Sequence, residues 1–408
     1  MKKQVLLIVL LVASSALGVR SQTIQDGDWI GKIIHRSGYY MDVIYEVRNS
    51  KGSLQITLQV EQYGPFEFKN IRITADSLYF VWTPAFDLPC TLARLPDGVY
   101  HGVCKDPWGG FGGAIMAPPG SDRDLLRLDE ETFLSIAGVN PDDSTPKEWL
   151  LGELYPKGST VELDGGAVNY VDVGNSPVTV ILMSGLGDNL SSWESLQQHL
   201  ASDFRVIAYD RPGLGLSEGS ESSRTPERMA KELKHLLQNI DVSPPYLLVA
   251  HAEASWAARQ YADLYAEEVQ GLVLIHPHHE HQAELWETLD PESWNSYWTR
   301  VKRFQSMLPG ATSQEFNVYA GIIDGEDVLD LSKVPPVPTF VLSAGRASEA
   351  PRWIGDSEEG RQAWSEFHAS WVEEMPQGQH MIIESSPYIH QEQPERVAEV
   401  IQNMISAK

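Results

Sequence analysis

The sequence is poor in cysteine, in positive charge and in long apolar runs. Its 408 residues include two cysteines, and 31 lysines and arginines stand against 56 aspartates and glutamates, for a formal charge of −25. So acidic a chain argues against nonspecific binding to nucleic acid or to anionic lipid. Beyond the N-terminus, no stretch of about 18 or more apolar residues suggests a membrane span. We therefore expect no nucleic-acid partner and no membrane span, while the oligomeric state stays open.

The N-terminus carries a pattern of its own. Lys2 and Lys3 precede the apolar run Val5–Val12, and small residues follow as far as Gly18. This order is typical of a secretory signal peptide, and the run is too short for a spanning helix. A bacterial lipid anchor is not indicated, because no cysteine lies near the cleavage region. We expect an exported protein, periplasmic or extracellular, that is cleaved after Gly18 or Ser21.

The two cysteines flank a turn. Cys90 and Cys104 each lie seven residues from Asp97, at the centre of Pro96-Asp97-Gly98. In a hairpin with a three-residue loop they would face each other across the two strands, near the distance that a disulfide needs. Export makes oxidation favourable. We predict a disulfide, with two free buried thiols as the alternative.

The length and the changing patterns divide the chain into two domains. Residues 1–21 are the expected signal peptide. Residues 22–120 contain short alternating β-like runs, which predict an antiparallel all-β sandwich or small barrel. Residues 121–157 are polar and predict a linker. In residues 158–408, strand-like and helical runs alternate, which predicts a mostly parallel sheet flanked by helices. The expected strands there are 178–183, 205–209, 246–250, 271–275 and 339–343, and the expected helices are 192–200, 226–240, 255–265 and 395–406.

Four segments of the second domain, in this order, resemble the α/β-hydrolase superfamily. They are Ser184–Gly187 with Trp193 following, Tyr209–Ser217, the turn at 250–255, and Gln391–Val397. The resemblance implies an α/β hydrolase fold with a lid at 277–337. It also implies a catalytic serine on the turn, a histidine near the C-terminus and an acid. The front domain looks like the small β-domain that precedes some exported bacterial members of the superfamily.

The chain departs from the superfamily where the chemistry should be. The matching frames place the nucleophile at Ala252 and the catalytic histidine at Pro387, so no catalytic residue is intact. A methyl group cannot attack a carbonyl, and proline can neither give nor take a proton. The acid falls on His276 or, less well aligned, on Glu349. His390 is three residues late for the catalytic position and is expected at the surface.

The resemblance also assigns two backbone groups and leaves two serines to consider. The N–H groups of Leu186 and Glu253 would form the oxyanion hole, and such backbone donors survive changes of side chain. Ser184 and Ser255 are poor substitutes for the nucleophile, because no base stands in a triad frame with either.

Histidines gather after the strand at 271–275. The run His276-Pro277-His278-His279-Glu280-His281 carries four of them, and His251 and Glu253 lie at the neighbouring strand end. Two or three imidazoles and a carboxylate can hold zinc and leave a position open for water. The spacing is unlike known zinc motifs, so a polar loop is the favoured interpretation. We expect no metal and no cofactor, and consider His251, His276, His278 and His279 as residues of a pocket or, alternatively, of a metal site.

The lid segment contains an amphipathic pattern. Trp294, Tyr297, Trp298 and Val301 follow the i, i+3, i+4, i+7 spacing of one helix face. Such a stripe docks the lid, and a pocket beneath it could take an apolar ligand.

Three hypotheses about function follow. The first is a catalytically impaired member, a pseudoenzyme, that binds a small or apolar ligand or a partner. The second is an active esterase-like hydrolase of small ester or acyl substrates that uses displaced or metal-assisted groups. The third is an interacting protein in which the β-domain matters most.

Overall fold

The computed structural model describes two folded regions. The described residues are 24–34, 40–50, 53–60, 64–82, 88–105, 111–122, 126, 158–163, 165–219, 223–305, 310–329, 331, 337–348 and 351–406. The expected signal peptide, most of the expected linker and Glu349 lie outside them. Within the described residues, no helix has the length and apolar character that a membrane crossing requires.

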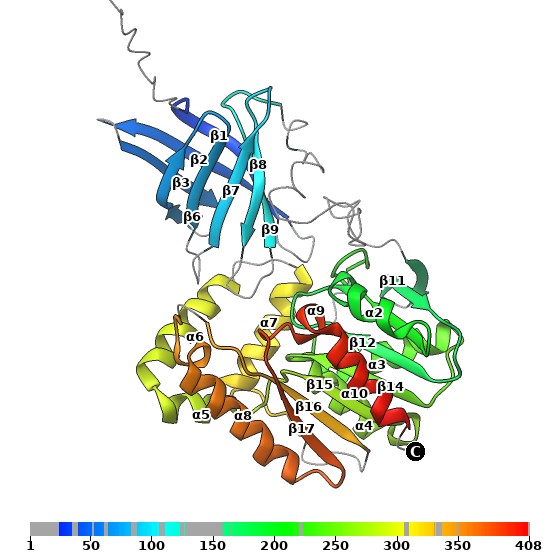
Figure 1. The fold of residues 1–408 in the computed structure, drawn as a ribbon. Coiled ribbons are helices and arrows are strands. Elements are labelled where there is room, and N and C mark those ends of the chain that lie inside the picture. Colours follow the sequence, from blue (N-terminus) through cyan, green and yellow to red (C-terminus); the bar gives the residue numbers. More distant parts are fainter. Residues whose placement is uncertain are drawn as a thin grey trace, which may run out of the picture.

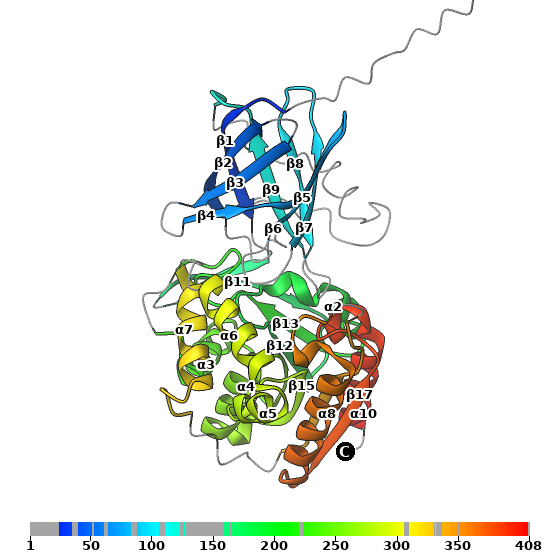
Figure 2. The ribbon, with the colours of Figure 1, turned by 90° about the vertical axis from the view of Figure 1, so that its left-hand side faces the viewer.

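The described residues of the first region form one antiparallel sheet of nine strands, in the order β4-β3-β2-β1-β9-β8-β7-β6-β5 (Figure 2). Its two outermost strands, β4 and β5, are separated in the chain by Phe68 alone. The Phe68 N–H donates to Ile56 O of β3 over 3.0 Å. The edges of the sheet therefore meet, and the domain is a nearly closed barrel rather than a sandwich. The strands are β1 (Gly27–Ile34), β2 (Tyr40–Ser50), β3 (Ser53–Val60), β4 (Gly64–Glu67), β5 (Lys69–Ile73), β6 (Ser77–Trp82), β7 (Leu88–Arg94), β8 (Tyr100–Lys105) and β9 (Phe111–Ala117).

Alternation along the strands builds the barrel core. In β7, Leu88, Cys90 and Leu92 are buried while the residues between them are exposed, as expected for a strand with one solvent-exposed face. The structure contains the predicted disulfide, since Cys90 pairs with Cys104 in register and the two sulfurs are bonded. The bond fastens β7 to β8 inside the core.

The second region is an α/β domain around an eight-stranded sheet, in the order β10-β11-β13-β12-β14-β15-β16-β17 for the described residues (Figure 1). The pairs β10–β11 and β11–β13 are antiparallel, and the others are parallel. This is the α/β hydrolase fold that was expected. The strands are β10 (Ser159–Leu163), β11 (Gly166–Val173), β12 (Thr179–Met183), β13 (Arg205–Tyr209), β14 (Tyr246–His251), β15 (Val269–Ile275), β16 (Thr339–Ala344) and β17 (Gly378–Ile383).

Helices cover both faces of this sheet. One face packs against α3, α4 and α8, and the other packs against α2 and α10, which gives three layers with a core on each side of the sheet. The fully buried strands β12 and β14 explain the continuous apolar runs in the sequence. The helices are η2 (Leu190–Trp193), α2 (Glu194–Leu200), α3 (Pro226–Asn239), α4 (Ala254–Leu264), η3 (Ala266–Glu268), η4 (Ile354–Asp356), α8 (Glu358–Glu373), α9 (Ile389–Glu392) and α10 (Pro394–Ser406).

Local signals place several of the helix ends. The Thr225 side chain accepts a hydrogen bond from Arg228 N over 3.2 Å, and Pro226 occupies the first turn of α3, which begins at the predicted residue. The helix expected from residue 192 instead begins as a 3₁₀ turn, because the Asn189 side chain accepts from Ser191 N over 2.9 Å and starts the turn earlier. The elements α8, β10, β11 and β17 were not predicted.

Three described helices lie between β15 and β16, in the segment expected to be the lid. They are α5 (Gln282–Leu289), α6 (Pro291–Gln305) and α7 (Gly310–Ile323). The predicted stripe of α6 packs into an aromatic cluster with Trp256 of α4 and Trp364 of α8. The barrel lies at the same end of the domain as α6 and α7 (Figures 1 and 2). There the Arg303 guanidinium of α6 lies 5.8 Å from the centre of the Phe66 ring of β4.

Candidate functional site

The turn between β14 and α4 has the shape of a nucleophile elbow. Ala252 sits between the strand and the helix with φ at 51°, a backbone conformation that is strained for a residue with a Cβ. Its N–H donates to Ile275 O of β15 over 3.0 Å, and its carbonyl accepts from His278 N over 3.2 Å. Bonds to the neighbouring strand end therefore hold the turn, although its side chain is only a methyl group.

A cavity of about 220 Å³ lies at this turn. It collects most of the positions that the sequence singled out, because the carboxyl ends of the parallel strands meet there. The lining comprises Gly185, Leu186, His251, Ala252, Glu253, His276, His278, Tyr297, Trp298, Val301, Phe316, Tyr319, Trp353, Asp356, Arg361, Pro387 and Tyr388. Ala252, Pro387 and His276, which the resemblance matched to the nucleophile, the histidine and one acid, all line this cavity.

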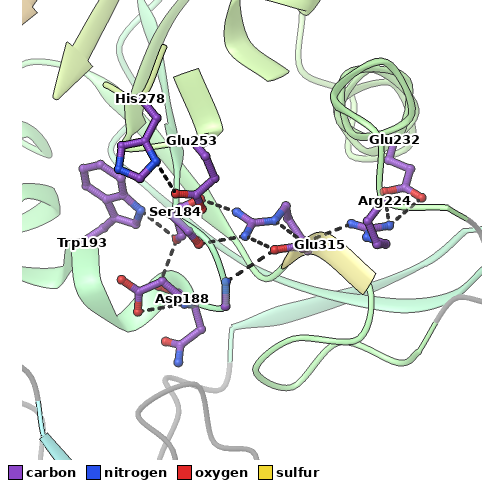
Figure 3. A network of polar contacts seen from close by, with 12 residues as sticks. Ser184, Asp188, Trp193, Arg224, Glu232, Glu253, His278 and Glu315 are labelled. Atoms are coloured by element: carbon purple, nitrogen blue, oxygen red, sulfur yellow. Dashed lines mark hydrogen bonds and ion pairs between the residues drawn. The ribbon is translucent and has the colours of Figure 1, made fainter. Parts of the chain in front are cut away.

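The loop expected to supply an oxyanion donor is held by a buried ion pair. Arg211, which follows β13, bonds both carboxylate oxygens of Glu315 on α7 over 2.7 Å each. The same guanidinium donates to the carbonyls of Ser184 and Gly185, and Glu315 accepts from Gly187 N over 3.4 Å (Figure 3). Leu186 lies within this loop. Its position beside the cavity is therefore fixed by α7 as well as by the sheet.

The close approach of His251 explains a glycine in that loop. A Cβ at Gly185 would lie 2.8 Å from His251 Nδ1, nearer than real Cβ contacts allow. His251 also packs against the Tyr388 ring, with 5.1 Å between ring centres. The loop, the elbow and the C-terminal segment therefore meet around one imidazole.

Glu253, whose carboxylate was considered beside the histidines as part of an alternative metal site, lines the cavity. Burial raises the pKa of its carboxyl to about 8, and the nearby carboxylates of Glu315 and Asp188 act in the same direction. Arg211 pulls the pKa down but is already paired with Glu315. The carboxyl of Glu253 is accordingly protonated at neutral pH. Its Oε2 lies 3.9 Å from His278 Nδ1 (Figure 3).

The four histidines of the expected pocket or metal site diverge. His251, His276 and His278 line the cavity, whereas His279 does not and packs against the rings of Phe367 and Trp371. In the part of the chain that the structure describes, no three His, Cys, Asp or Glu side chains are placed to hold one metal ion. The spread arises because successive residues after β15 point to different neighbours.

His276 cannot play the part of the missing acid. Its backbone has φ at 43°, and Ala344 N donates to its Nδ1 over 3.2 Å. Arg361 Nη1 of α8 lies 3.3 Å from its Nε2. Burial and this guanidinium hold the pKa of His276 well below its usual value, so the ring is neutral. The position therefore offers no negative charge to orient a base.

His390 is not at the surface, and that expectation was wrong. It is fully buried, with its ring 4.2 Å from that of Trp193 and 4.6 Å from that of His251. The reason is the short helix α9, which turns His390 inward beneath η2. Pro387, in contrast, lines the cavity.

Both serines that were considered as substitutes are engaged in the core. Ser184 Oγ donates to Asn189 O over 3.0 Å and accepts from Trp193 Nε1 over 2.9 Å. Ser255 is fully buried and its Oγ donates to His278 O over 3.2 Å. Neither lines the cavity.

Two charged residues of the cavity were not predicted from the sequence. Asp356 of η4 and Arg361 of α8 line it and form an ion pair over 3.3 Å. A signal was present, because Ser357 precedes a segment in which Trp364, His368 and Trp371 recur at helical spacing. The Ser357 side chain caps α8 by accepting from Gly360 N over 3.0 Å.

Comparisons with known proteins agree with this geometry. The family model described as alpha/beta hydrolase fold matches residues 178–308. Uncharacterized protein YqjL of Bacillus subtilis is 30% identical over 226 residues, which cover 54% of this chain and 81% of that protein. The chain belongs to the α/β-hydrolase superfamily.

Other proteins are similar over shorter spans or at lower identity. An AB hydrolase superfamily protein of Gibberella zeae is 28% identical over 127 residues, or 31% of this chain and 35% of that protein. The solved structure of a thermophilic esterase from Thermogutta terrifontis has a TM-score of 0.45 at 19% identity. The match covers 61% of this chain and 99% of the esterase.

Proposed function

We propose that this α/β-hydrolase-fold protein lacks serine-type hydrolytic activity and acts by binding a small or apolar molecule in its cavity. The observation that carries the proposal is Ala252 at the tip of a formed elbow, with Pro387 lining the same cavity. Loss of the serine in a serine hydrolase costs about six orders of magnitude in turnover. Binding and backbone donors alone retain roughly 10³–10⁴ over water.

The lining of the cavity supports ligand binding. Six of its aromatic side chains belong to the lid or to the segments that follow it, and they line the cavity together with the polar groups of the elbow. Such a site, mostly apolar with a few convergent polar groups, is the usual form of a small-molecule pocket. The aromatic residues are Tyr297, Trp298, Phe316, Tyr319, Trp353 and Tyr388.

The alternative is an esterase-like hydrolase that uses displaced or metal-assisted groups. Among the described residues that line the cavity there is no serine, threonine or cysteine. The divergence of the four histidines also weighs against a shared metal site among them. An assay of ester hydrolysis distinguishes this alternative from ligand binding.

The test is hydrolysis of short aryl esters by the purified mature chain, with and without a chelator. We expect no turnover above that of a matched, heat-inactivated sample. Activity that the chelator abolishes would support metal-assisted chemistry. Activity that is indifferent to the chelator would mean that another nucleophile acts, and either result would overturn the proposal.

We further propose that the protein is exported. The support is the order of lysines, apolar residues and small residues before position 22, together with the disulfide in the barrel. N-terminal sequencing of the protein from its native source should begin at residue 19 or 22. A sequence that begins at Met1 would contradict the proposal.

A further inference from the structure

Two polar atoms at the elbow side of the cavity are buried without a hydrogen-bond partner among the described residues. They are Glu253 Oε1 and His278 Nδ1. The nearest approach between the two side chains is 3.9 Å, from Glu253 Oε2 to His278 Nδ1. This is too long for a direct hydrogen bond, and one oxygen atom that enters between them after a small shift of either side chain would bond to both. A buried polar group without a hydrogen-bond partner destabilises the folded protein, and a ligand that bonds to it removes this cost.

We propose that Glu253 and His278 form the recognition point for a small uncharged ligand that carries a ring and a carbonyl group. The carbonyl oxygen lies between the two side chains and accepts hydrogen bonds from the Glu253 carboxyl and from His278 Nδ1–H. This inference rests on the proposed function, because it assigns the chemistry of the ligand that the cavity takes.

The size of the cavity and its aromatic lining favour a ligand that contains a ring. An apolar cavity of roughly 150 Å³ accepts benzene, and this cavity measures about 220 Å³. It therefore has room for a single ring with a short substituent. The rings of Trp298, Phe316 and Tyr319 pack together with 5.7 to 6.0 Å between their centres, inclined to one another, and supply an aromatic wall.

The charged residues in and near the cavity are already paired, which favours an uncharged ligand. Arg361 is the one lysine or arginine among the described lining residues, and it is paired with Asp356. Behind the wall, Arg211 is already bound by Glu315 through two hydrogen bonds. A ligand carboxylate would find no cation to replace its hydration, and burying it would be costly.

The surroundings of Glu253 make it a donor at neutral pH. Burial raises its pKa to about 8, and burial lowers the pKa of His278 to about 4, so both groups are uncharged near pH 7. Above about pH 8 the carboxylate forms and presents only acceptors to the ligand's carbonyl. Among the described residues, the charged or titratable groups that act on Glu253 include Arg211, Glu315, Asp188, Tyr319 and His278.

Calorimetry with three probes tests the proposal on the mature chain at pH 6.5 and pH 9.5. The probes are acetophenone, toluene and benzoate. We expect acetophenone to bind more tightly than toluene at pH 6.5 and to lose about tenfold or more in affinity at pH 9.5. Toluene should bind equally at both values, and benzoate should bind more weakly than acetophenone.

Two substitutions of Glu253 separate hydrogen bonding from shape. Glu253→Gln keeps a donor that does not titrate, so acetophenone should bind alike at both pH values. Glu253→Leu removes the donor, so the preference for acetophenone over toluene should disappear. The matched control is Glu284→Gln on α5, an exposed glutamate of the lid whose replacement should change neither affinity nor pH dependence.

Unfolding gives a readout that does not depend on any ligand. A carboxyl whose pKa is about 8 when folded favours folding fully only below about pH 4.5, and it loses that contribution as the pH rises to 8. Glu253→Gln should therefore raise the unfolding temperature at pH 9 relative to the unchanged chain, and less so at pH 5.

The outcomes distinguish the two proposals. If acetophenone and toluene bind equally at both pH values, the recognition point is wrong while the cavity still binds ligands. Tighter binding of benzoate would overturn the uncharged ligand. If no probe binds, the ligand-binding function falls together with this inference.

Discussion

Ala252 shows how a backbone can hold a position for which the side chain offers no chemistry. A left-handed conformation costs a residue with a Cβ roughly 1–2 kcal/mol, and the bonds to Ile275 and His278 offset it. His276, at the end of the next strand, has the same kind of backbone. Both residues are turned toward the cavity by these conformations. A serine at position 252 would therefore be presented to a bound ligand.

Placing that serine should not by itself restore an esterase. We expect Ala252→Ser to raise aryl-ester turnover by less than about tenfold, because a hydroxyl without a base is a weak nucleophile. Ala252→Ser combined with Pro387→His should exceed the single variant by about 10² or more, which is the typical contribution of a general base. Initial rates with a short aryl ester decide between the two.

The control for this experiment is Ser255→Ala, which removes a buried hydroxyl that does not line the cavity. It should leave the rates of both variants unchanged. Fast turnover by Ala252→Ser alone would show that His251 or His390, whose rings lie 4.6 Å apart beside the elbow, already acts as a base.

At the scale of elements, α7 is locked to the sheet. Glu315, with 1% of its side chain exposed, joins Arg211 after β13, and Arg224 lies 3.6 Å away on the other side. Burial alone would raise the pKa of Glu315, but Arg211 holds it below its usual value, so the pair is charged. Movement of α7 would break this pair and release the loop around Leu186. A ligand is therefore not expected to enter the cavity by movement of α7.

Removing one partner of the buried pair should be strongly destabilising. Arg211→Met leaves the Glu315 carboxylate buried and should cost about 3 kcal/mol, at the low end for such pairs because Arg224 remains nearby. Arg211→Met with Glu315→Leu should recover most of the loss. Urea unfolding monitored by tryptophan fluorescence measures both.

An exposed pair provides the comparison. Glu399→Gln on α10 breaks the surface contact with Arg396 and should change stability by no more than about 0.5 kcal/mol. An equal loss for Glu399→Gln and Arg211→Met would contradict the anchoring of α7.

Elements with strong local signals were predictable, and those without were not. The Thr225 cap, the first-turn Pro226 and the stripe of α6 each act within a few residues, so α3 and α6 could be read from the sequence. The edge strand β17 has a mixed pattern of burial, since it pairs on one side only. It therefore carries no clear period. Helix α8 is different, because it was missed although its Ser357 cap was a local signal.

At the scale of the whole molecule, several histidines are buried, and burial lowers their pKa. Burial lowers the pKa of His278 and His279 to about 4 and that of His368 to about 3, and the pKa of His276 and His380 is lowered as well. His368 donates from Nε2 to Pro277 O over 3.0 Å, so its Nδ1 accepts from Ser343 Oγ over 2.6 Å. The neutral ring of His368 makes two hydrogen bonds, which connect α8 to β16 and to the loop after β15.

Acid should therefore destabilise the protein. Below about pH 6.5 the unfolded chain takes up a proton on each of these histidines, while burial keeps them neutral to lower pH in the folded chain, so stability is lost as the pH falls. Glu253 acts in the opposite sense but is a single group. We expect the unfolding temperature at pH 5 to lie several degrees below that at pH 7, with thermal scans as the measurement.

One substitution identifies the source of this dependence. His368→Gln should reduce the pH slope of the unfolding free energy at pH 5 by about one proton, or roughly 1.4 kcal/mol per pH unit. His281→Gln, at an exposed ring, should leave the slope unchanged. A slope unaffected by His368→Gln would mean that His368 is already charged in the folded protein.

The sequence by itself determined the division into a β-domain and an α/β domain, the pairing of Cys90 with Cys104, and the absence of the serine at position 252. Each of these depends on periodicity, on the distance from a turn or on the identity of one residue. Only the tertiary structure decided that the first sheet closes into a barrel and that His390 is buried. It alone brought Glu253, His278, Arg211 and Glu315 together. Burial and pairing of charges arise where segments far apart in the chain meet, and no local pattern records which segments those are.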